Sequence, residues 1–379
     1  MRAAILRPRG LRVAAAIGLL ALGSASGGAS LPRRKASLPS KSAALTPPSA
    51  PLPPTTAPLP YRLLPIDERV TMRGRINGEL VMVPDGDLAQ ESDLADAIAR
   101  TRATQPYRPR PALWRIRKHD STIYLFGTIH SLPPGFRWRS PRLETVIAQA
   151  DRLLLESTDG SIDGAGTLLL GEKTPGAPNL PPLAERLPPE KRIPLKIFQA
   201  TLPNAAVKLL DGMPTWVAAM AIGYVRDLRA GNRPGPGADD WLEARFRGVH
   251  KPIEAIEDSA KVVANVNAVP EDQQRAMLLA SLEAPQRSGA QLDAPTHAWA
   301  QGDLGATSPL VAELEGPEAT GALRDPLLTR RNQAWADSLA DRLKQPGVVL
   351  FAAGAGHFLG DDSVIALLKR RGIKVTRVE

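Results

Sequence analysis

Two of the five histidines, His130 and His357, occupy matching places in the sequence. Each comes directly after an apolar segment, and each has a glycine three residues before it, Gly127 or Gly354. A glycine at that place allows a sharp turn of the backbone and leaves space for a substrate or an ion beside the imidazole. Neutral imidazoles together with a carboxylate suit a divalent transition metal such as zinc, manganese or cobalt. This pattern predicts a metal site that activates water.

Glutamates end two other apolar segments of the chain. Glu156 follows residues 152–155, and Glu257 follows residues 252–256. If these segments are parallel strands, their carboxyl ends meet at the edge of the sheet where ligands bind. We expect one of these carboxylates to help hold the ion and one to act as general base toward the bound water.

The alternative for each motif histidine is a buried, hydrogen-bonded core residue, and the matching settings of the two favour the metal site. Three aspartates near the ends of expected elements, Asp239, Asp240 and Asp258, are candidates for helix caps. The chain lacks H-E-x-x-H, G-x-S-x-G, a P-loop, and G-x-G-x-x-G after a strand, which removes the main support for zincin, serine hydrolase, nucleotide and dinucleotide functions. Surface or packing roles are expected for the other histidines, His119, His250 and His297.

The expected elements form two similar units that would position these residues. In the first, a strand pair at 114–116 and 122–126 runs into Gly127, a helix starts at Ser140-Pro141, and a strand covers 152–155. In the second, a long helix precedes a buried strand. The expected elements of this second unit are a helix through 327–343, a strand at 348–353, a helix that begins at Asp361-Asp362 and ends at Gly372, and a strand at 373–378.

Alternating strands and helices predict an α/β fold with a mostly parallel central sheet, built from two strand-GxxH-helix-strand units. A helical middle insertion, at about 180–340, separates the units and is expected to cap the crevice. It contains one buried strand candidate at 252–256. The helices expected in the insertion cover 188–200, 214–226, 238–247 and 270–283.

The N-terminal region has three parts. Residues 1–29 combine a basic stretch, an apolar stretch of about ten residues and small residues, which predicts a signal peptide. An uncleaved membrane anchor is the alternative, although a membrane-spanning helix needs roughly 20 apolar residues. Residues 30–60 hold nine prolines and are expected to be a disordered linker. Residues 61–110 form an extension without an assigned role, with a hairpin around Asn77-Gly78 and a helix near 94–102.

Charge and cysteine content limit the function classes. The net charge is +9, but residues 1–60 hold eight basic residues and no acidic one, so residues 61–379 carry about +1. With 4% aromatic residues and no basic stripe, a nucleic-acid partner is not expected. The chain has no cysteine, which excludes disulfides, a thiol nucleophile and a cysteine zinc site.

Several short blocks between residues 111 and 379 occur in an order that resembles one known family. The blocks and their order are similar to those of the TraB/GumN family, which includes the TIKI membrane-tethered metalloproteases that act on Wnt proteins. The blocks are Pro111-Ala-Leu-Trp114, Tyr124-Leu-Phe-Gly-Thr-Ile-His130, Leu154-Leu-Glu156, Gly237-Ala-Asp239-Asp-Trp-Leu242, Lys251-Pro-Ile-Glu-Ala-Ile-Glu257, Trp299-Ala-Gln-Gly-Asp303, Arg331-Asn332 and Gly354-Ala-Gly-His357.

The resemblance implies an α/β domain over 111–379 with a divalent-metal site. His130 and His357 match the motif histidines and Glu156 the glutamate, whereas Glu257, Asp239, Arg331 and Asn332 match further polar positions. On this basis we expect a metal-dependent hydrolase, with Arg331 stabilising an oxyanion and Asn332 orienting other groups.

The expected hydrolase is a peptidase that is exported to the periplasm or secreted, and it is tethered to the membrane if the N-terminal segment is not cleaved. Its expected substrate is a peptide or protein. The alternative is an exported binding protein without enzymatic activity, in which the same crevice holds a peptide, a polysaccharide or a metal complex.

Overall fold

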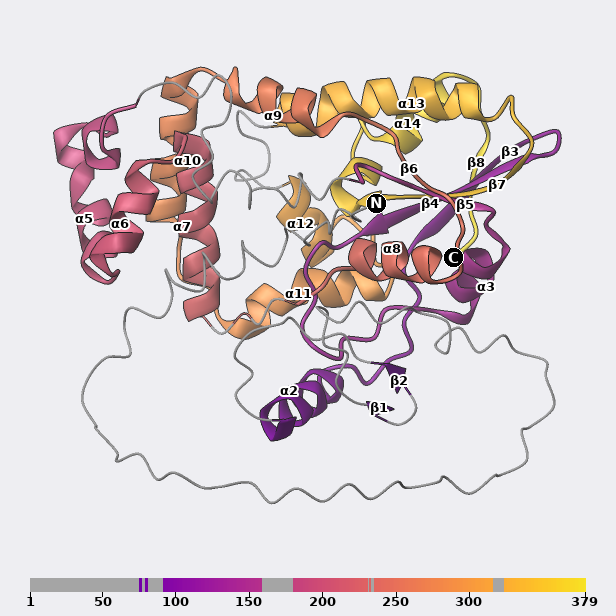
Figure 1. Cartoon of the computed structure of the whole chain (residues 1–379), viewed down its shortest axis with the longest axis horizontal. Helices are drawn as coiled ribbons and strands as arrows, with labels where there is room; N and C mark the ends of the chain where they lie inside the picture. Colours follow the sequence, from indigo (N-terminus) through magenta and orange to yellow (C-terminus); the bar gives the residue numbers. More distant parts are fainter. Residues whose placement is uncertain are drawn as a thin grey trace, which may run out of the picture.

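The structure is a computed structural model (Figure 1). The signal peptide predicted at 1–29 and the linker predicted at 30–60 lie outside the residues that it describes. Within the described part of the chain, no helix is both long and apolar enough to cross a membrane. The described residues are 75–76, 79–80, 91–158, 180–230, 232, 235–315 and 324–379.

A six-stranded sheet with the order β6-β5-β7-β4-β3-β8 forms the centre of the domain. Neighbours from β6 to β4 are parallel, and β3 pairs antiparallel with both β4 and β8. The predicted α/β fold with a mostly parallel sheet is confirmed. The strands are β3 (Leu113–Lys118), β4 (Ser121–Thr128), β5 (Arg152–Leu155), β6 (Ile253–Ala255), β7 (Gly347–Gly354) and β8 (Val375–Arg377).

The first predicted unit runs from β3 through α3 (Pro141–Gln149) to β5. Strand β4 is buried along almost its whole length, as expected for an apolar strand with a parallel neighbour and helices on both faces of the sheet. The predicted start of α3 is confirmed, because the Ser140 hydroxyl accepts a hydrogen bond from the Leu143 N–H at 3.0 Å and proline occupies the first turn.

The second unit follows the same order but differs in detail. Its helix α14 (Val364–Arg370) was predicted to begin at Asp361-Asp362, and this was wrong, because Ser363 is the N-cap and accepts from the Ala366 N–H at 3.2 Å. Asp362 is used elsewhere, by Arg324 and Thr329. Gly372 ends the helix with φ +74°, as predicted. The returning strand β8 joins the sheet edge at β3, whereas β5 lies between β6 and β7.

Two layers of helices cover the sheet (Figure 1). On one face, α3, α8 (Ala238–Gly248) and α11 (Gly289–Ala300) pack through Leu143, Phe246 and Trp299. On the other face, α13 (Arg330–Arg342) and α14 pack through residues such as Trp335 and Leu368. Alternate residues of β7 point to the two cores, so this central strand joins the layers. A single π-helical turn, Asp325–Thr329, leads into α13.

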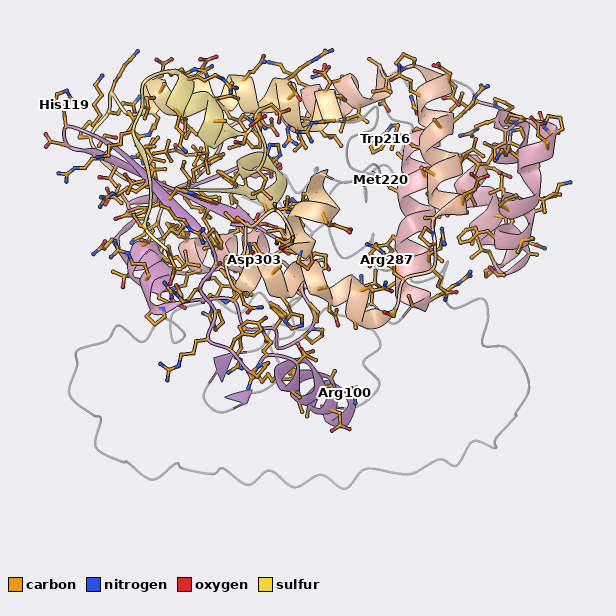
Figure 2. The ribbon with its side chains drawn as sticks, turned by 180° about the vertical axis from the view of Figure 1, so that it is seen from behind. Arg100, His119, Trp216, Met220, Arg287 and Asp303 are labelled. Atoms are coloured by element: carbon orange, nitrogen blue, oxygen red, sulfur yellow. The ribbon has the colours of Figure 1, made fainter. Side chains whose placement is uncertain are left out.

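The helical insertion has a hydrophobic core of its own, at the end of the molecule away from the sheet. Figure 2 shows Trp216 and Met220 of its long helix at this end, and His119 at the opposite end on the tip of the β3–β4 hairpin. The predicted helices of the insertion are confirmed. The remaining insertion elements are η3 (Leu183–Arg186), η4 (Pro189–Lys191), α5 (Arg192–Ala200), α6 (Asn204–Asp211), α7 (Thr215–Arg229), α9 (Ser259–Asn267), α10 (Glu271–Glu283) and α12 (Pro309–Glu315).

The strand predicted at 252–256 is present as β6, but the prediction that it is buried was wrong. It is an edge strand that pairs with β5 alone, and its residues are half-buried or exposed. In the N-terminal extension, the two short strands of the predicted hairpin pair antiparallel, and the predicted helix is confirmed. These elements are β1 (Arg75–Ile76), β2 (Glu79–Leu80) and α2 (Glu91–Ala103).

Candidate functional site

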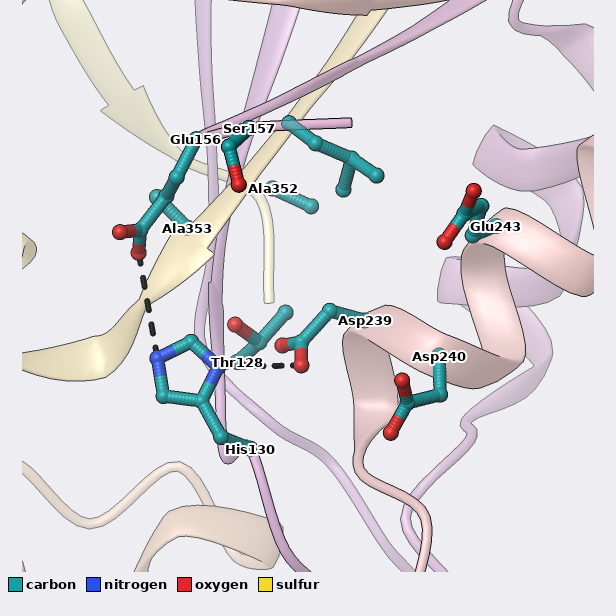
Figure 3. A pocket seen from close by; sticks show the side chains of 10 residues that line it. Thr128, His130, Glu156, Ser157, Asp239, Asp240, Glu243, Ala352 and Ala353 are labelled. Atoms are coloured by element: carbon teal, nitrogen blue, oxygen red, sulfur yellow. Dashed lines mark hydrogen bonds and ion pairs between the residues drawn. The ribbon is translucent and has the colours of Figure 1, made fainter. Parts of the chain in front are cut away.

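Three neighbouring strands bring His130, His357 and Glu156 together. These residues follow β4, β7 and β5, which lie side by side with their carboxyl ends at one edge of the sheet. The Nε2 atoms of His130 and His357 each lie 3.9 Å from the same oxygen, Oε1 of Glu156. Figure 3 shows the Glu156 carboxylate facing the His130 ring. The sequence pattern thus identified three residues that converge in space.

The other ring nitrogen of each histidine contacts an oxygen acceptor. Nδ1 of His130 lies 3.0 Å from Oδ2 of Asp239, and Nδ1 of His357 lies 2.6 Å from Oδ1 of Asn332. The Asn332 amide nitrogen donates to the Asp362 carbonyl, which fixes the amide with its oxygen toward the ring. In its neutral form each histidine therefore carries the proton on Nδ1 and presents the Nε2 lone pair toward Glu156, as metal-binding histidines do.

Arg331 is the permanent cation of the site. Its guanidinium forms ion pairs with Glu156 and Glu257, and its Nη1 lies 3.3 Å from His357 Nε2. Both oxygens of Glu257 are occupied, since Arg331 Nε lies 3.0 Å from each and the Trp335 indole N–H donates to one at 2.9 Å. The structure thus separates the two predicted carboxylates, because Glu156 faces the imidazoles and Glu257 holds Arg331.

Burial and charge set the protonation states. Burial alone would raise the pKa of Glu156, but the opposing charges of His357, Arg331 and His130 and a hydrogen bond from the Gly354 N–H lower it to about 2. Burial disfavours the imidazolium form of His357, and Arg331 repels it, so the pKa of His357 falls to about 3 although Glu156 favours the charge. Burial also raises the pKa of Glu257. At pH 7 the site contains an ionised Glu156 and a neutral His357.

Two imidazoles and a carboxylate are donor types that suit a divalent ion. Among the described residues, no group of three or more His, Asp or Glu is positioned to hold a metal as the side chains stand. Zn–N bonds of about 2.0–2.1 Å place tetrahedral ligands roughly 3.3 Å apart, so the 3.9 Å separations are somewhat wide. Nevertheless, both imidazole Nε2 atoms lie at the same distance from one carboxylate oxygen, and the Arg331 contact to His357 Nε2 is long for a hydrogen bond.

Gly354 keeps the space between the donors open. A Cβ on Gly354 would lie 3.0 Å from Nε2 of His130 and 3.3 Å from Oε1 of Glu156. The glycine of the second motif therefore leaves room beside the histidine of the first. Gly127 acts differently, since a Cβ there would meet Cα of Ala355 at 3.0 Å. Its lack of a side chain lets the two motif loops pack against each other, and neither glycine has a positive φ.

We expect Gly354→Ala to weaken metal binding more than it destabilises the fold. The new methyl group would push the His130 ring, which is half exposed and can move away, off the line to Glu156. Gly223→Ala on α7 is the matched control, because nothing lies within 4 Å of its Cβ position. Isothermal titration with zinc and urea unfolding of both variants would check this. Equal zinc affinity in wild type and Gly354→Ala would contradict it.

The free energy of unfolding of the metal-free protein is expected to fall as pH drops from 6.5 to 3. In this window the unfolded chain binds a proton at His357, whose ordinary pKa is 6.5, while the folded chain does not until pH about 3. The contribution of His357 to the free energy of unfolding is therefore complete above pH 6.5. It falls by about 1.4 kcal/mol per pH unit as the pH drops toward 3. Glu156 adds a loss in the same direction between pH 4.5 and 2.

Urea unfolding at several pH values, with His357→Gln as the comparison, measures this effect. As pH falls, the unfolding free energy of the wild type should decrease relative to that of His357→Gln. Parallel profiles of the two proteins would show that His357 is not held neutral.

Trp335 was not singled out by the sequence patterns, but it contacts two residues of the site. Trp335 packs against His357 in a tilted arrangement with ring centroids 4.1 Å apart, and it donates to Glu257, which explains its complete burial in α13. Its position four residues after Arg331, on the same helical face, is the signal that a helical wheel would have provided. Asp240 and Asp258 cap α8 and α9, as the sequence suggested.

The three remaining histidines lie where surface or packing roles were expected. His119 and His250 are exposed in turns with positive φ. His297 packs edge-on against Tyr107 and contacts its hydroxyl.

Comparisons with known proteins found a matching family profile and several relatives of this chain. The sequence profile of the TraB/PrgY/gumN family matches residues 112–377. A protein of Escherichia coli (strain K12), described as the uncharacterized protein YbaP, is 26% identical over 251 residues, which cover 65% of this chain and 88% of the relative. An uncharacterized protein of Treponema pallidum (strain Nichols) is 23% identical over 269 residues, covering 68% of this chain and 80% of the relative. No solved structure matches this chain.

Proposed function

Because the chain belongs to the TraB/PrgY/gumN family, we propose that the residues around Glu156 form the active site of an exported, metal-dependent hydrolase that acts on peptides. The observation that carries this proposal is the pair of imidazole Nε2 atoms at 3.9 Å from one carboxylate oxygen, each ring fixed by an acceptor at Nδ1. Histidines with only a packing role have no need to converge on a charged group.

His130 Nε2, His357 Nε2 and Glu156 Oε1 would hold the ion, which could be zinc, manganese or cobalt. Such an ion supplies Lewis acidity and lowers the pKa of a bound water. Because His357 is already neutral and Glu156 already ionised at pH 7, these two ligands need not lose a proton before binding. A pKa of about 2 also makes Glu156 a better ligand than proton acceptor.

Arg331 and its partners would act on the substrate side of the site. Its Nη1 lies beside His357 Nε2, where it can donate to an oxygen that gains negative charge during hydrolysis. Glu257 positions Arg331 through both of its oxygens and touches no imidazole, so we assign it a positioning role. Asn332 and Asp239 orient the two histidines.

The proposed location outside the cytoplasm rests on residues 1–29. Their basic, apolar and small-residue segments follow the order of a signal peptide. Cleavage would release the protein into the periplasm or the medium, and an uncleaved segment would tether the domain to the membrane through the proline-rich linker.

Turnover of a peptide library by the purified full chain, with zinc, manganese or cobalt and with EDTA, tests the proposal. We expect hydrolysis that depends on metal and is lost in His130→Ala, His357→Ala and Glu156→Gln. His250→Ala is the control, because His250 lies in an exposed turn. Hydrolysis that persists in all three variants would refute the assigned site. Metal binding without turnover of any substrate would favour the alternative, a binding protein for a peptide, polysaccharide or metal complex.

A further inference from the structure

A pocket opens beside His130 and Glu156, along the first turns of α8. Its volume is about 460 Å³ when the open space at its mouth is included. One wall carries the carboxylates of Asp239, Asp240 and Glu243 (Figure 3). The opposite wall, at the ends of β5 and β7, contains the apolar side chains Leu155, Ala352 and Ala353 together with Ser157 and Glu156. The pocket thus combines an acidic side and a partly apolar side next to the candidate active site.

Each of the three carboxylates has a partner within the chain, since Oδ2 of Asp239 contacts His130, Asp240 caps α8 and Glu243 pairs with Arg247. Asp240 caps α8 by accepting the Gly237 N–H at 2.7 Å, but Asp239 and Glu243 lie one helical turn apart on the same face. Burial raises the pKa of Glu243, and although Arg247 lowers it, the negative charge of Asp239 raises it further. The positive end of α8 favours Asp239 but reaches only its first turn, so Glu243 gains little from it.

Two polar side-chain atoms of residues that line the pocket are buried and have no hydrogen-bond partner among the described residues. They are Oδ1 of Asp239 and Oγ1 of Thr128. Thr128 is 1% exposed, so its hydroxyl is removed from bulk solvent. Thr128 lines the pocket, and Figure 3 shows it in the same view as Asp239. Buried polar atoms of this kind are normally paired. The carboxylate oxygen can only accept and the hydroxyl can accept as well, so a ligand that donates hydrogen bonds would satisfy both.

We propose that this pocket is a subsite for a lysine or arginine side chain of the substrate. An ammonium or guanidinium group donates several hydrogen bonds and accepts none, which matches the acceptors Asp239 Oδ1 and Thr128 Oγ1 and the charge of Glu243. The aliphatic stem of such a side chain would lie against Leu155, Ala352 and Ala353. A free N-terminal amine lacks this stem and leaves these apolar side chains uncovered. The inference rests on the proposed function only in taking the substrate to be a peptide.

Peptide binding to the full chain in EDTA tests the subsite without any need for hydrolysis. The probes are fluorescently labelled acetyl-Ala-Ala-Xaa-Ala-Ala amides in which Xaa is lysine, arginine or norleucine, and their dissociation constants are measured by fluorescence polarisation. We expect lysine and arginine to bind roughly tenfold more tightly than norleucine. Glu243→Gln should reduce that preference roughly three- to tenfold and leave norleucine binding unchanged.

Thr128→Val, which keeps the shape of the side chain, should also reduce the preference for lysine. Glu283→Gln is the matched control, since Glu283 pairs with Lys191 on the surface of the helical insertion and should have no effect. A lysine peptide that binds no better than the norleucine peptide would overturn the proposal. An unacetylated norleucine peptide that binds as tightly as the acetylated lysine peptide would overturn it as well, because the cation would then be an N-terminal amine.

The outcomes separate this inference from the proposed function. A preference for lysine that Glu243→Gln weakens, together with no hydrolysis of any peptide, would support the subsite and count against the hydrolase. Metal-dependent hydrolysis without a preference for basic residues would support the hydrolase and overturn the subsite.

Discussion

Arg331→Ala is expected to lower the free energy of unfolding of the metal-free protein by roughly 3–5 kcal/mol at pH 7. The side chains of Arg331, Glu156 and Glu257 are 7%, 9% and 12% exposed, so water cannot replace the lost guanidinium. Removing it would leave two buried carboxylates without their shared cation. Urea unfolding monitored by tryptophan fluorescence and by circular dichroism measures the loss.

Arg371→Ala is the control for this first prediction. Arg371 pairs with Asp337 on the surface, with side-chain exposures of 28% and 67%, and an ion pair of this kind contributes about 0–1 kcal/mol. Equal losses of unfolding free energy in the two variants would contradict the view that Arg331 is the cation of a buried cluster.

Asn332→Leu is expected to weaken divalent-metal binding roughly 10–100-fold, although Asn332 would not touch the ion. The Asn332 oxygen accepts the Nδ1 proton of His357 and thereby keeps Nε2 unprotonated. Leucine has a similar volume but no acceptor, so the ring would lose its orientation. The orphaned N–H would also cost about 1–3 kcal/mol of unfolding free energy. Zinc titration and urea unfolding measure the two effects.

Asn332→Asp supplies the control for this second prediction. It restores an acceptor at the same place, and we expect it to recover most of the zinc affinity that Asn332→Leu loses. If leucine and aspartate give the same zinc affinity, the Asn332 hydrogen bond does not govern His357.

Much of the fold could be predicted from local sequence. The continuous apolar run at 348–353 indicated a buried strand, and it became the central strand β7. Ser140-Pro141 and Gly372 mark helix ends by their own backbone and side-chain chemistry, which does not depend on distant residues. Because strand ends in a parallel sheet share an edge, the placement of His130, His357 and Glu156 at strand ends also predicted their convergence.

The partners of these residues could not be predicted, because they come from distant parts of the chain. Nothing near Asp361-Asp362 in the sequence shows that Arg324 and Thr329 occupy Asp362 and leave the helix cap to Ser363. Likewise, Gly354 has its effect on His130, more than 200 residues earlier, and not on the histidine of its own motif.

The two glutamates illustrate the same limit within the site. Both follow strands, and only the packed structure shows that Glu257 holds Arg331 while Glu156 faces the imidazoles.

Strand β6 was expected to be buried because of its apolar composition. It is an edge strand instead, because it has a neighbouring strand on one side only.

Titration of the metal-free chain with cobalt(II), followed by visible absorption, tests the central claim most directly, because the ligand-field bands report the donor atoms around the ion. We predict saturation with a single ion per chain, bands typical of nitrogen and oxygen donors, and loss of this signal in both His130→Ala and His357→Ala but not in His250→Ala. Unchanged cobalt affinity and spectrum in the His130→Ala and His357→Ala variants would contradict the metal site.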